Sequence, residues 1–235
     1  MYQADKPFLR PTLYAEQLLV TGILDGTYPP GASLPAERTL AEQLGVTRQT
    51  VREVLQRLAK DRWVTIRHGK STTVNDFWRE GGLGILNTLV GHMEFLPSSF
   101  IPHLLEARAV FMPTCARAAI PACRQEFIQY LDRAPLLPET AAAYAAYDWE
   151  LQAMMAKKSK NPVYPLILND FAPLFRSLGE AYFGLSEGRA ASAEYYGKLR
   201  QAVIRQTGIE SVVRRAMQES TRIWKKEFQQ PPKSI

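Results

Sequence analysis

The sequence predicts a mainly α-helical protein, in which an N-terminal winged helix-turn-helix with a small β-hairpin wing precedes a C-terminal α-helical bundle. Three observations predict this fold. Residues 35–78 hold two short helical patterns that are separated by a glycine and followed by a hairpin pattern. From about residue 102 onward, apolar residues recur at helical spacing without strand patterns. The chain of 235 residues is also long enough to bury two hydrophobic cores.

The first helical pattern ends at Gly45. Pro35 suits the first position of that helix, where its missing N–H is not needed. Leu40 and Leu44 lie four residues apart on one face, and Gly45 can adopt the left-handed conformation that ends a helix. Thr47 is a good N-cap for the next helix, because its hydroxyl accepts a hydrogen bond from a free backbone N–H. The spacing therefore predicts two short helices joined by a turn.

The second helix presents arginines opposite its apolar face. Arg48, Gln49 and Arg52 point away from that face, near the helix N-terminus, where helices of this motif meet base edges. An arginine can bind guanine or a phosphate through two parallel hydrogen bonds. The residues that form the apolar face repeat at i, i+3, i+4 and i+7: Val51, Val54, Leu55 and Leu58.

Positive charge is concentrated in the same segment. The whole chain has a formal net charge of +6 and an isoelectric point of about 9.3. Residues 48–70 alone hold seven Lys or Arg against two acidic residues. Phosphate contacts dominate the affinity of DNA-binding proteins, so a local excess matters more than the total. A solvated basic face is the alternative, but the coincidence of cap, apolar face, turn and hairpin favours DNA binding.

A β-hairpin wing is expected after the second helix. Residues 63–66 alternate large apolar and smaller side chains, and residues 71–74 form a short return strand. The tip between them reads Arg-His-Gly-Lys, so an imidazole lies beside two cations. A tip over the minor groove gains from the negative potential there. By itself His68 would be an exposed turn histidine without a role, but beside the helix motif a DNA contact is favoured.

The second half of the chain reads as helices separated by Pro, Gly or Asn, and Pro173 is expected to kink the third of them. Bundles of this kind place ligand sites between facing helices. We expect a DNA-binding domain at residues 1–76, a linker at 77–84 and an effector domain at 85–235. The expected helices cover about residues 102–119, 139–157, 162–183, 187–206 and 208–228.

Three polar side chains interrupt the apolar faces of these helices. Arg108, Asp148 and Ser220 each lie among apolar residues, and Glu219 precedes Ser220. A buried charge without a partner is costly. One interpretation is an ion pair of Arg108 with Asp148 or Glu219 that organises the core. The other is a polar-lined pocket that receives a ligand head group. The residues alone leave both interpretations open.

Other classes of protein find less support. No stretch is long and apolar enough to span a bilayer, and no N-terminal signal pattern is present, so a cytoplasmic protein is expected. The two cysteines lack C-x-x-C spacing, and Cys115 is expected as a reduced thiol in the core. The chain contains neither a glycine-rich phosphate loop nor a G-x-S-x-G elbow, so we expect no catalytic residues.

Residues 8–78 resemble the N-terminal domain of the GntR family of bacterial regulators, and the pattern PGxxLPAER at residues 30–38 carries much of this resemblance. The patterns NPVYPLIL at 161–168 and ESTRIW at 219–224 are similar to those of the acyl-CoA-responsive fatty acid regulators within that family. The resemblance implies a homodimer that binds a palindromic operator in double-stranded DNA. The implied DNA contacts are Arg38, Arg48, Thr50, Arg52, His68 and Gly69.

The resemblance further implies that a long-chain acyl-CoA binds in the bundle as the effector ligand and releases the protein from its operator. Genes of fatty acid degradation would be repressed, and genes of unsaturated fatty acid synthesis would be activated. The implied ligand contacts are Arg108, Tyr182, Glu219, Ser220 and Trp224. The cations suited to the CoA phosphates are Arg214, Arg215, Lys225 and Lys226.

Three residues depart from the pattern of these relatives. Arg62 stands where the family usually has a glycine, which puts the local turn geometry in question. Met217 replaces a glycine near the ligand, and a bulkier side chain there would narrow the site. Gln229 replaces an expected lysine, and its loss would lower the affinity for CoA.

Two alternatives concern the effector domain. Many GntR regulators sense small carboxylates through a metal held by one Asp and three His. Here Gln152 occupies an expected histidine position one turn after Asp148, and no histidine follows His103, so we expect no metal cofactor. An acyl-CoA hydrolase that uses Glu219 and Ser220 is the other alternative, but Ser220 has no obvious general base.

Overall fold

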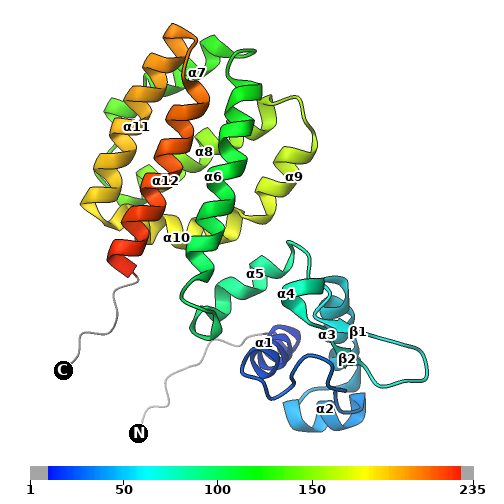
Figure 1. The fold of residues 1–235 in the computed structure, drawn as a ribbon. Coiled ribbons are helices and arrows are strands. Elements are labelled where there is room, and N and C mark those ends of the chain that lie inside the picture. Colours follow the sequence, from blue (N-terminus) through cyan, green and yellow to red (C-terminus); the bar gives the residue numbers. More distant parts are fainter. Residues whose placement is uncertain (1–9, 229–235) are drawn as a thin grey trace, which may run out of the picture. The chain divides into compact units, whose positions relative to one another are not determined.

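The structure, a computed structural model, describes residues 10–228 (Figure 1). The expected fold class is confirmed, because a winged helix-turn-helix is followed by a bundle of helices. Two compact units divide between Leu96 and Pro97, later in the chain than the linker expected at 77–84. None of the helices within the described range is long and apolar enough to cross a membrane.

The first unit packs three helices against a short hairpin. The buried face of α3 consists of the four apolar residues predicted for it. In the hairpin Val64 pairs with Val74, and an isolated bridge joins Ser33 to Thr73. Trp63 is completely buried beneath the hairpin. The elements are α1 (Pro11–Leu24), α2 (Glu37–Leu44), α3 (Arg48–Lys60), β1 (Val64–Thr65) and β2 (Thr73–Val74).

Local backbone chemistry sets the helix ends of this motif. Gly45 adopts the predicted left-handed conformation, with φ of 66°, and the Thr47 hydroxyl accepts a hydrogen bond from the Thr50 N–H at 3.1 Å. The prediction that Pro35 begins α2 was wrong, because the helix begins at Glu37. The N–H of Leu34 donates to the Thr72 carbonyl at 2.8 Å, so the chain before α2 runs extended beside the hairpin. The helix therefore begins two residues after Pro35.

The segment between the hairpin and Leu96 is also part of the first unit. It forms α4 (Phe77–Glu80), α5 (Ile85–Leu89) and the 3-10 helix η1 (Val90–Phe95). The Phe77 ring packs on Trp63 with their centroids 4.8 Å apart. Part of the range expected as a linker therefore contributes to a hydrophobic core.

The second unit consists of helices, with α6 against α12 and α8, and α11 against α12 and α7 (Figure 1). Cys115 is buried in this core as expected, and burial raises the pKa of its thiol to about 12. The elements are α6 (Phe100–Ala119), α7 (Arg124–Leu131), the 3-10 helix η2 (Ala134–Leu136), α8 (Ala141–Lys158), α9 (Val163–Asp170), α10 (Ala172–Gly184), α11 (Ser186–Arg205) and α12 (Ile209–Phe228).

One expected helix is divided in two. The pattern at residues 162–183 predicts a single helix kinked at Pro173, but α9 ends at Asp170 and α10 begins at Ala172. Pro173 lies in the first turn of α10, where its ring and missing N–H are tolerated. The proline therefore begins a helix and does not kink one. The short helix α7 was not expected.

Candidate functional site

The first candidate site is the exposed surface of α2, α3 and the wing. Arg48 and Arg52 are exposed on α3, opposite its buried face, as the spacing predicts. Arg48 has no ion-pair partner among residues 10–228. Arg52 donates from Nη2 to Oε2 of Glu37 at 2.9 Å, and the hydrogen bond and charge of Glu37 raise the pKa of Arg52. Arg38 pairs with Glu42 at 3.2 Å. Arg38 and Arg52 are therefore each paired with a carboxylate, and a DNA phosphate would have to compete with that carboxylate for the guanidinium.

Thr50, His68 and Gly69 complete the residues expected to contact DNA. The Thr50 hydroxyl lies 2.9 Å from that of Thr47, so it takes part in capping α3. His68 and Gly69 are exposed at the wing tip, where the Lys70 N–H donates to the Arg67 carbonyl at 3.2 Å. Gly69 has a φ of 69°, a conformation that side chains other than glycine rarely adopt. The structure thus places two of the six residues on the wing and four on the helix-turn-helix.

The second candidate site is a cavity of about 230 Å³ in the helical unit. Residues of α6, α8, α9, α10, α11 and α12 line it, and most of them are apolar. Such cavities suit ligands with an apolar body and a few placed polar groups. The lining includes each expected ligand contact: Arg108, Tyr182, Glu219, Ser220 and Trp224.

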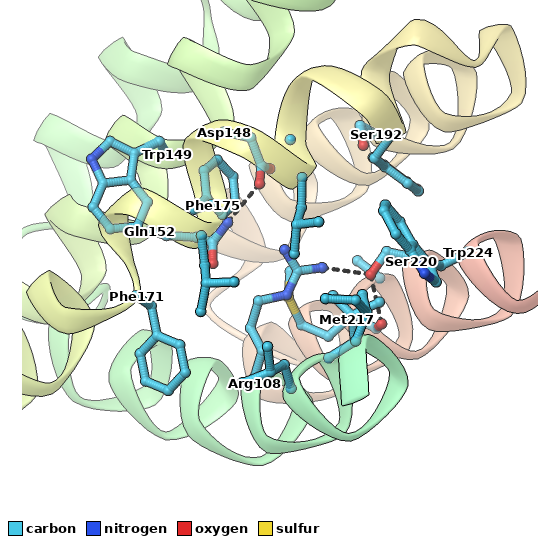
Figure 2. A pocket seen from close by; sticks show the side chains of 18 of the residues that line it. Arg108, Asp148, Trp149, Gln152, Phe171, Phe175, Ser192, Met217, Ser220 and Trp224 are labelled. Atoms are coloured by element: carbon cyan, nitrogen blue, oxygen red, sulfur yellow. Dashed lines mark hydrogen bonds between the residues drawn. The ribbon is translucent and has the colours of Figure 1, made fainter. Parts of the chain in front are cut away.

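Arg108 and Ser220 meet inside this cavity. Arg108 Nη2 donates to the Ser220 hydroxyl, which donates in turn to the Met217 carbonyl at 2.8 Å (Figure 2). Among residues 10–228 Arg108 forms no ion pair, so neither ion pair considered from the sequence is present. Glu219 instead pairs with Arg222 at 2.6 Å, and this hydrogen bond lowers the pKa of Glu219. The guanidinium therefore enters the cavity with a hydroxyl as its hydrogen-bond partner and not a carboxylate.

Asp148 lies across the cavity from Ser220 (Figure 2). Its carboxyl accepts hydrogen bonds from Gln152 Nε2 at 2.6 Å and from the Tyr196 hydroxyl at 3.1 Å. Burial raises the pKa of Asp148, although the charge of Arg108 and both hydrogen bonds oppose that rise. In the described part of the chain, no three His, Cys, Asp or Glu side chains gather as metal ligands would.

Two of the expected ligand contacts, Tyr182 and Trp224, are aromatic residues of the cavity wall. Burial raises the pKa of Tyr182 to about 12, and its ring packs edge-on against Phe183. Trp224 is buried and stacks on Phe228 with their centroids 4.2 Å apart. Both rings therefore contribute to packing as well as to the cavity wall.

The cations expected near the CoA phosphates lie on α12, and several have acidic partners. Lys225 pairs with Glu106 at 3.1 Å, and Lys226 pairs with Glu187 at 2.6 Å. These side chains are about half exposed, so the pairs are weak and open to exchange with another anion. Met217 is buried and lines the cavity, whereas Gln229 lies outside the described residues.

Sequence reasoning missed part of the lining. Trp149, Phe171 and Phe175 form one wall of the cavity (Figure 2). Gln152 was considered only as a missing histidine, and Tyr195 was not considered. Helical spacing could have identified Gln152 and Tyr195 as lining residues. Gln152 follows Asp148 by one turn, and Tyr195 shares the buried face of α11 with Ser192 and Leu199.

Known proteins resemble both units. Residues 11–74 match the family model of bacterial regulatory proteins, gntR family, and residues 75–235 match that of the FadR C-terminal domain. A "Fatty acid metabolism regulator protein" of Shewanella pealeana is 45% identical over 83% of this chain and 81% of its own length. The protein of the same name from Shewanella halifaxensis is 44% identical, with the same shares covered.

A solved structure shares the fold. It is that of Lar, whose description states that it controls expression of the Listeria monocytogenes agr system. The TM-score is 0.60 at 16% sequence identity, and the match covers 95% of this chain and 100% of that one. At this identity the likeness concerns the fold alone.

Proposed function

Because the chain belongs to the GntR family of bacterial regulatory proteins and to its FadR group, we propose that it leaves its operator when a long-chain acyl-CoA binds. It is a regulator of fatty acid metabolism and not an enzyme. In the proposal it represses genes of fatty acid degradation and activates genes of unsaturated fatty acid synthesis. Both proposed ligands, chromosomal DNA and acyl-CoA, occur in the bacterial cytoplasm, which is the proposed place of action.

The observation that carries the ligand proposal is the environment of Arg108. A guanidinium in an apolar cavity needs oxygen acceptors, and here its partner is the hydroxyl of Ser220. Its buried Nε atom has no hydrogen-bond partner among residues 10–228. A thioester carbonyl or a phosphate supplies such acceptors, while the apolar walls accommodate an acyl chain.

We propose that the DNA complex is that of a homodimer on a palindromic operator. A two-fold symmetric protein matches the symmetry of two half-sites, each read by one α3 helix in the major groove. The proposed contacts are Arg38, Arg48, Thr50, Arg52, His68 and Gly69. Release from DNA then requires that acyl-CoA binds more tightly to the state that binds DNA poorly.

A gel-shift titration tests the proposal. The probe is a duplex selected from a random pool by the wild-type protein, titrated with and without palmitoyl-CoA. We expect wild type to be released, whereas Arg108→Met should bind the duplex normally and resist release. Arg200→Met is the matched control, since Arg200 lies outside the cavity lining and pairs with Asp132. Unchanged operator affinity of the wild type at saturating palmitoyl-CoA would refute the proposed release.

The cavity volume favours a second candidate, a GntR regulator that senses a shorter acyl group or a small carboxylate. Ligand pockets commonly measure about 300–1,000 Å³, whereas this cavity measures about 230 Å³. Met217 occupies part of its wall. A thermal-shift panel of acyl-CoAs of increasing length, free fatty acids and small carboxylates distinguishes the two candidates by which compound stabilises the protein most.

A further inference from the structure

Two more polar atoms of the cavity wall lack a hydrogen-bond partner within the described range. They are Oε1 of Gln152 and the hydroxyl oxygen of Tyr195. Gln152 is 1% exposed and Tyr195 is 5% exposed, so bulk water does not serve either group. Buried polar groups are almost always paired, and an unpaired one is costly. A ligand that brings a partner for both atoms would remove this cost.

The surrounding structure orients the Gln152 amide. Its Nε2 donates to the buried carboxyl of Asp148 at 2.6 Å. The amide oxygen consequently points away from Asp148 (Figure 2), and Gln152 lines the same cavity as Arg108. Gln152 thus offers the cavity its amide oxygen as an acceptor, beside the second N–H of its Nε2.

Tyr195 is an exception among the buried tyrosines of this unit. Tyr130, Tyr144, Tyr147 and Tyr196 all direct their hydroxyls to a protein oxygen, at distances of 2.8 to 3.1 Å. The Tyr195 hydroxyl meets none among residues 10–228, although its neighbour Tyr196 bonds to Asp148. Tyr195 lines the same cavity as Asp148 and Arg108, whose charges act on its hydroxyl.

We propose that the preferred ligand is an acyl group that carries a hydroxyl near its carbonyl end. This inference rests on the proposed function, since it assumes that an acyl group occupies the cavity. A hydroxyl both donates and accepts, so it can donate to Gln152 Oε1 and accept from Tyr195. A keto group would satisfy only Tyr195, and an unsubstituted chain would satisfy neither residue.

Selectivity should follow from this pairing. An unsubstituted acyl chain that fills the cavity leaves two buried polar atoms without partners, whereas a hydroxyacyl chain pairs both. Sites that hydrogen-bond a ligand hydroxyl reject the analogue that lacks it. From the usual cost of an unpaired buried group we expect a preference of about tenfold or more.

Calorimetric titration of the full chain measures this preference. The probes are 3-hydroxytetradecanoyl-CoA and tetradecanoyl-CoA, with the free 3-hydroxy acid in parallel. Tyr195→Phe should lower the preference by binding the unsubstituted thioester more tightly, and its fold should be intact because the lost hydroxyl has no partner among residues 10–228. Tyr130→Phe is the control, since Tyr130 is buried outside the cavity lining and should keep the preference. Gln152→Met replaces the amide by an apolar side chain of similar length, and measuring the preference of this variant is a second test of the hydroxyl contact.

The outcomes separate this inference from the proposed function. Equal affinity of wild type for the two thioesters overturns the hydroxyl contact and leaves acyl-CoA sensing intact. An unchanged preference in Tyr195→Phe also overturns it. Binding of neither thioester, together with unchanged operator affinity, removes the proposed function and this inference with it. If the free hydroxy acid binds as tightly as its thioester, the hydroxyl contact stands and the ligand is the acid.

Discussion

Arg62 ends α3 in the left-handed conformation, with a φ of 64°. The Trp63 N–H donates to the Leu58 carbonyl at 2.8 Å, and the Arg62 N–H donates to the Ala59 carbonyl at 3.1 Å. This is the Schellman arrangement, in which the residue at the position of Arg62 is usually glycine. A side chain in this conformation costs roughly 1–2 kcal/mol. The departure noted in the sequence therefore corresponds to a real strain in the turn.

We predict that Arg62→Gly stabilises the first unit. Removal of the side chain relieves the strain, while the greater freedom of glycine in the unfolded chain offsets about 0.5–1 kcal/mol of the gain. The net increase in unfolding free energy should be about 0.5–1 kcal/mol, measured by urea denaturation. Lys60→Gly, within the same helix end, should be destabilising instead. A loss of stability in Arg62→Gly would contradict the strain.

Arg48 and Arg52 should differ in the part of the DNA that they contact. Arg48 has no ion-pair partner in the described chain, whereas Glu37 holds Arg52. We predict that replacing a guanine-reading arginine by alanine costs about 1–3 kcal/mol at one base position only, whereas a lost phosphate contact weakens all sequences alike. Binding of Arg48→Ala and Arg52→Ala to duplexes substituted at each position distinguishes these roles. Unaltered operator affinity in both folded variants would mean that α3 does not dock as proposed.

Asp148 should make stability fall as the pH rises. Burial raises its pKa in the folded protein above the ordinary value of 3.8. Between the unfolded and folded pKa values the folded state binds more protons, so the unfolding free energy decreases with rising pH. In Asp148→Asn this decrease should disappear. Urea denaturation from pH 4 upward should therefore show the variant gaining stability relative to wild type, and a difference that does not vary with pH would contradict this account.

The structure also shows why sequence reasoning found Arg108 and missed its partner. A cation on an apolar helical face is visible in the spacing of one helix. The choice of Ser220 over Asp148 and Glu219 depends on how α6 meets α12, which spacing within one helix does not contain. The unpaired atom of Gln152 likewise depends on the orientation that Asp148 imposes on its amide.

At the scale of elements, the junction of α10 and α11 depends on a close contact. A Cβ atom at Gly188 would lie 2.5 Å from the Tyr182 carbonyl oxygen and 3.3 Å from its ring. Only glycine allows α11 to begin so close to the end of α10. Since Tyr182 lines the cavity, this contact also holds part of the ligand site in place.

Two alanine substitutions within α11 should therefore have opposite effects. Gly188→Ala should be destabilising by about 1–3 kcal/mol through overpacking and should weaken acyl-CoA binding. Gly197→Ala should be stabilising by about 1 kcal/mol, because Gly197 is exposed in the helix and a Cβ there meets no atom of the described residues within 4 Å. Thermal unfolding and ligand titration of both variants check this. Equal stability of the two would show that the contact with Tyr182 is unimportant.

Elements were predictable where their determinants are local. The cap, apolar face and glycine turn around α3 all lie within a few residues of one another, and each was found where the sequence places it. The break between α9 and α10 was not predictable from periodicity. Ile167, Phe171 and Leu174 all face the same cavity, so the apolar pattern continues across two helices. The short helix α7 spans too few turns to show a period.

At the scale of the whole molecule, each proposed ligand has its own compact unit. The residues proposed to contact DNA lie in the first unit, and the cavity lies in the second. Release of DNA by acyl-CoA is then a coupling free energy between two sites, and such coupling is reciprocal. The reciprocity can be measured without knowing how the two units are arranged.

We predict that the operator weakens acyl-CoA binding by the same factor by which acyl-CoA weakens operator binding. Couplings of this kind are typically about 1–3 kcal/mol, which corresponds to roughly 5–150-fold in affinity. Calorimetric titration of palmitoyl-CoA into the free protein and into the protein saturated with the selected duplex gives one factor. Operator titrations without and with palmitoyl-CoA give the other. Arg108→Met should lose both effects together. If palmitoyl-CoA bound the operator complex and the free protein equally well, the two sites would be uncoupled, and displacement of the protein from DNA would need another cause.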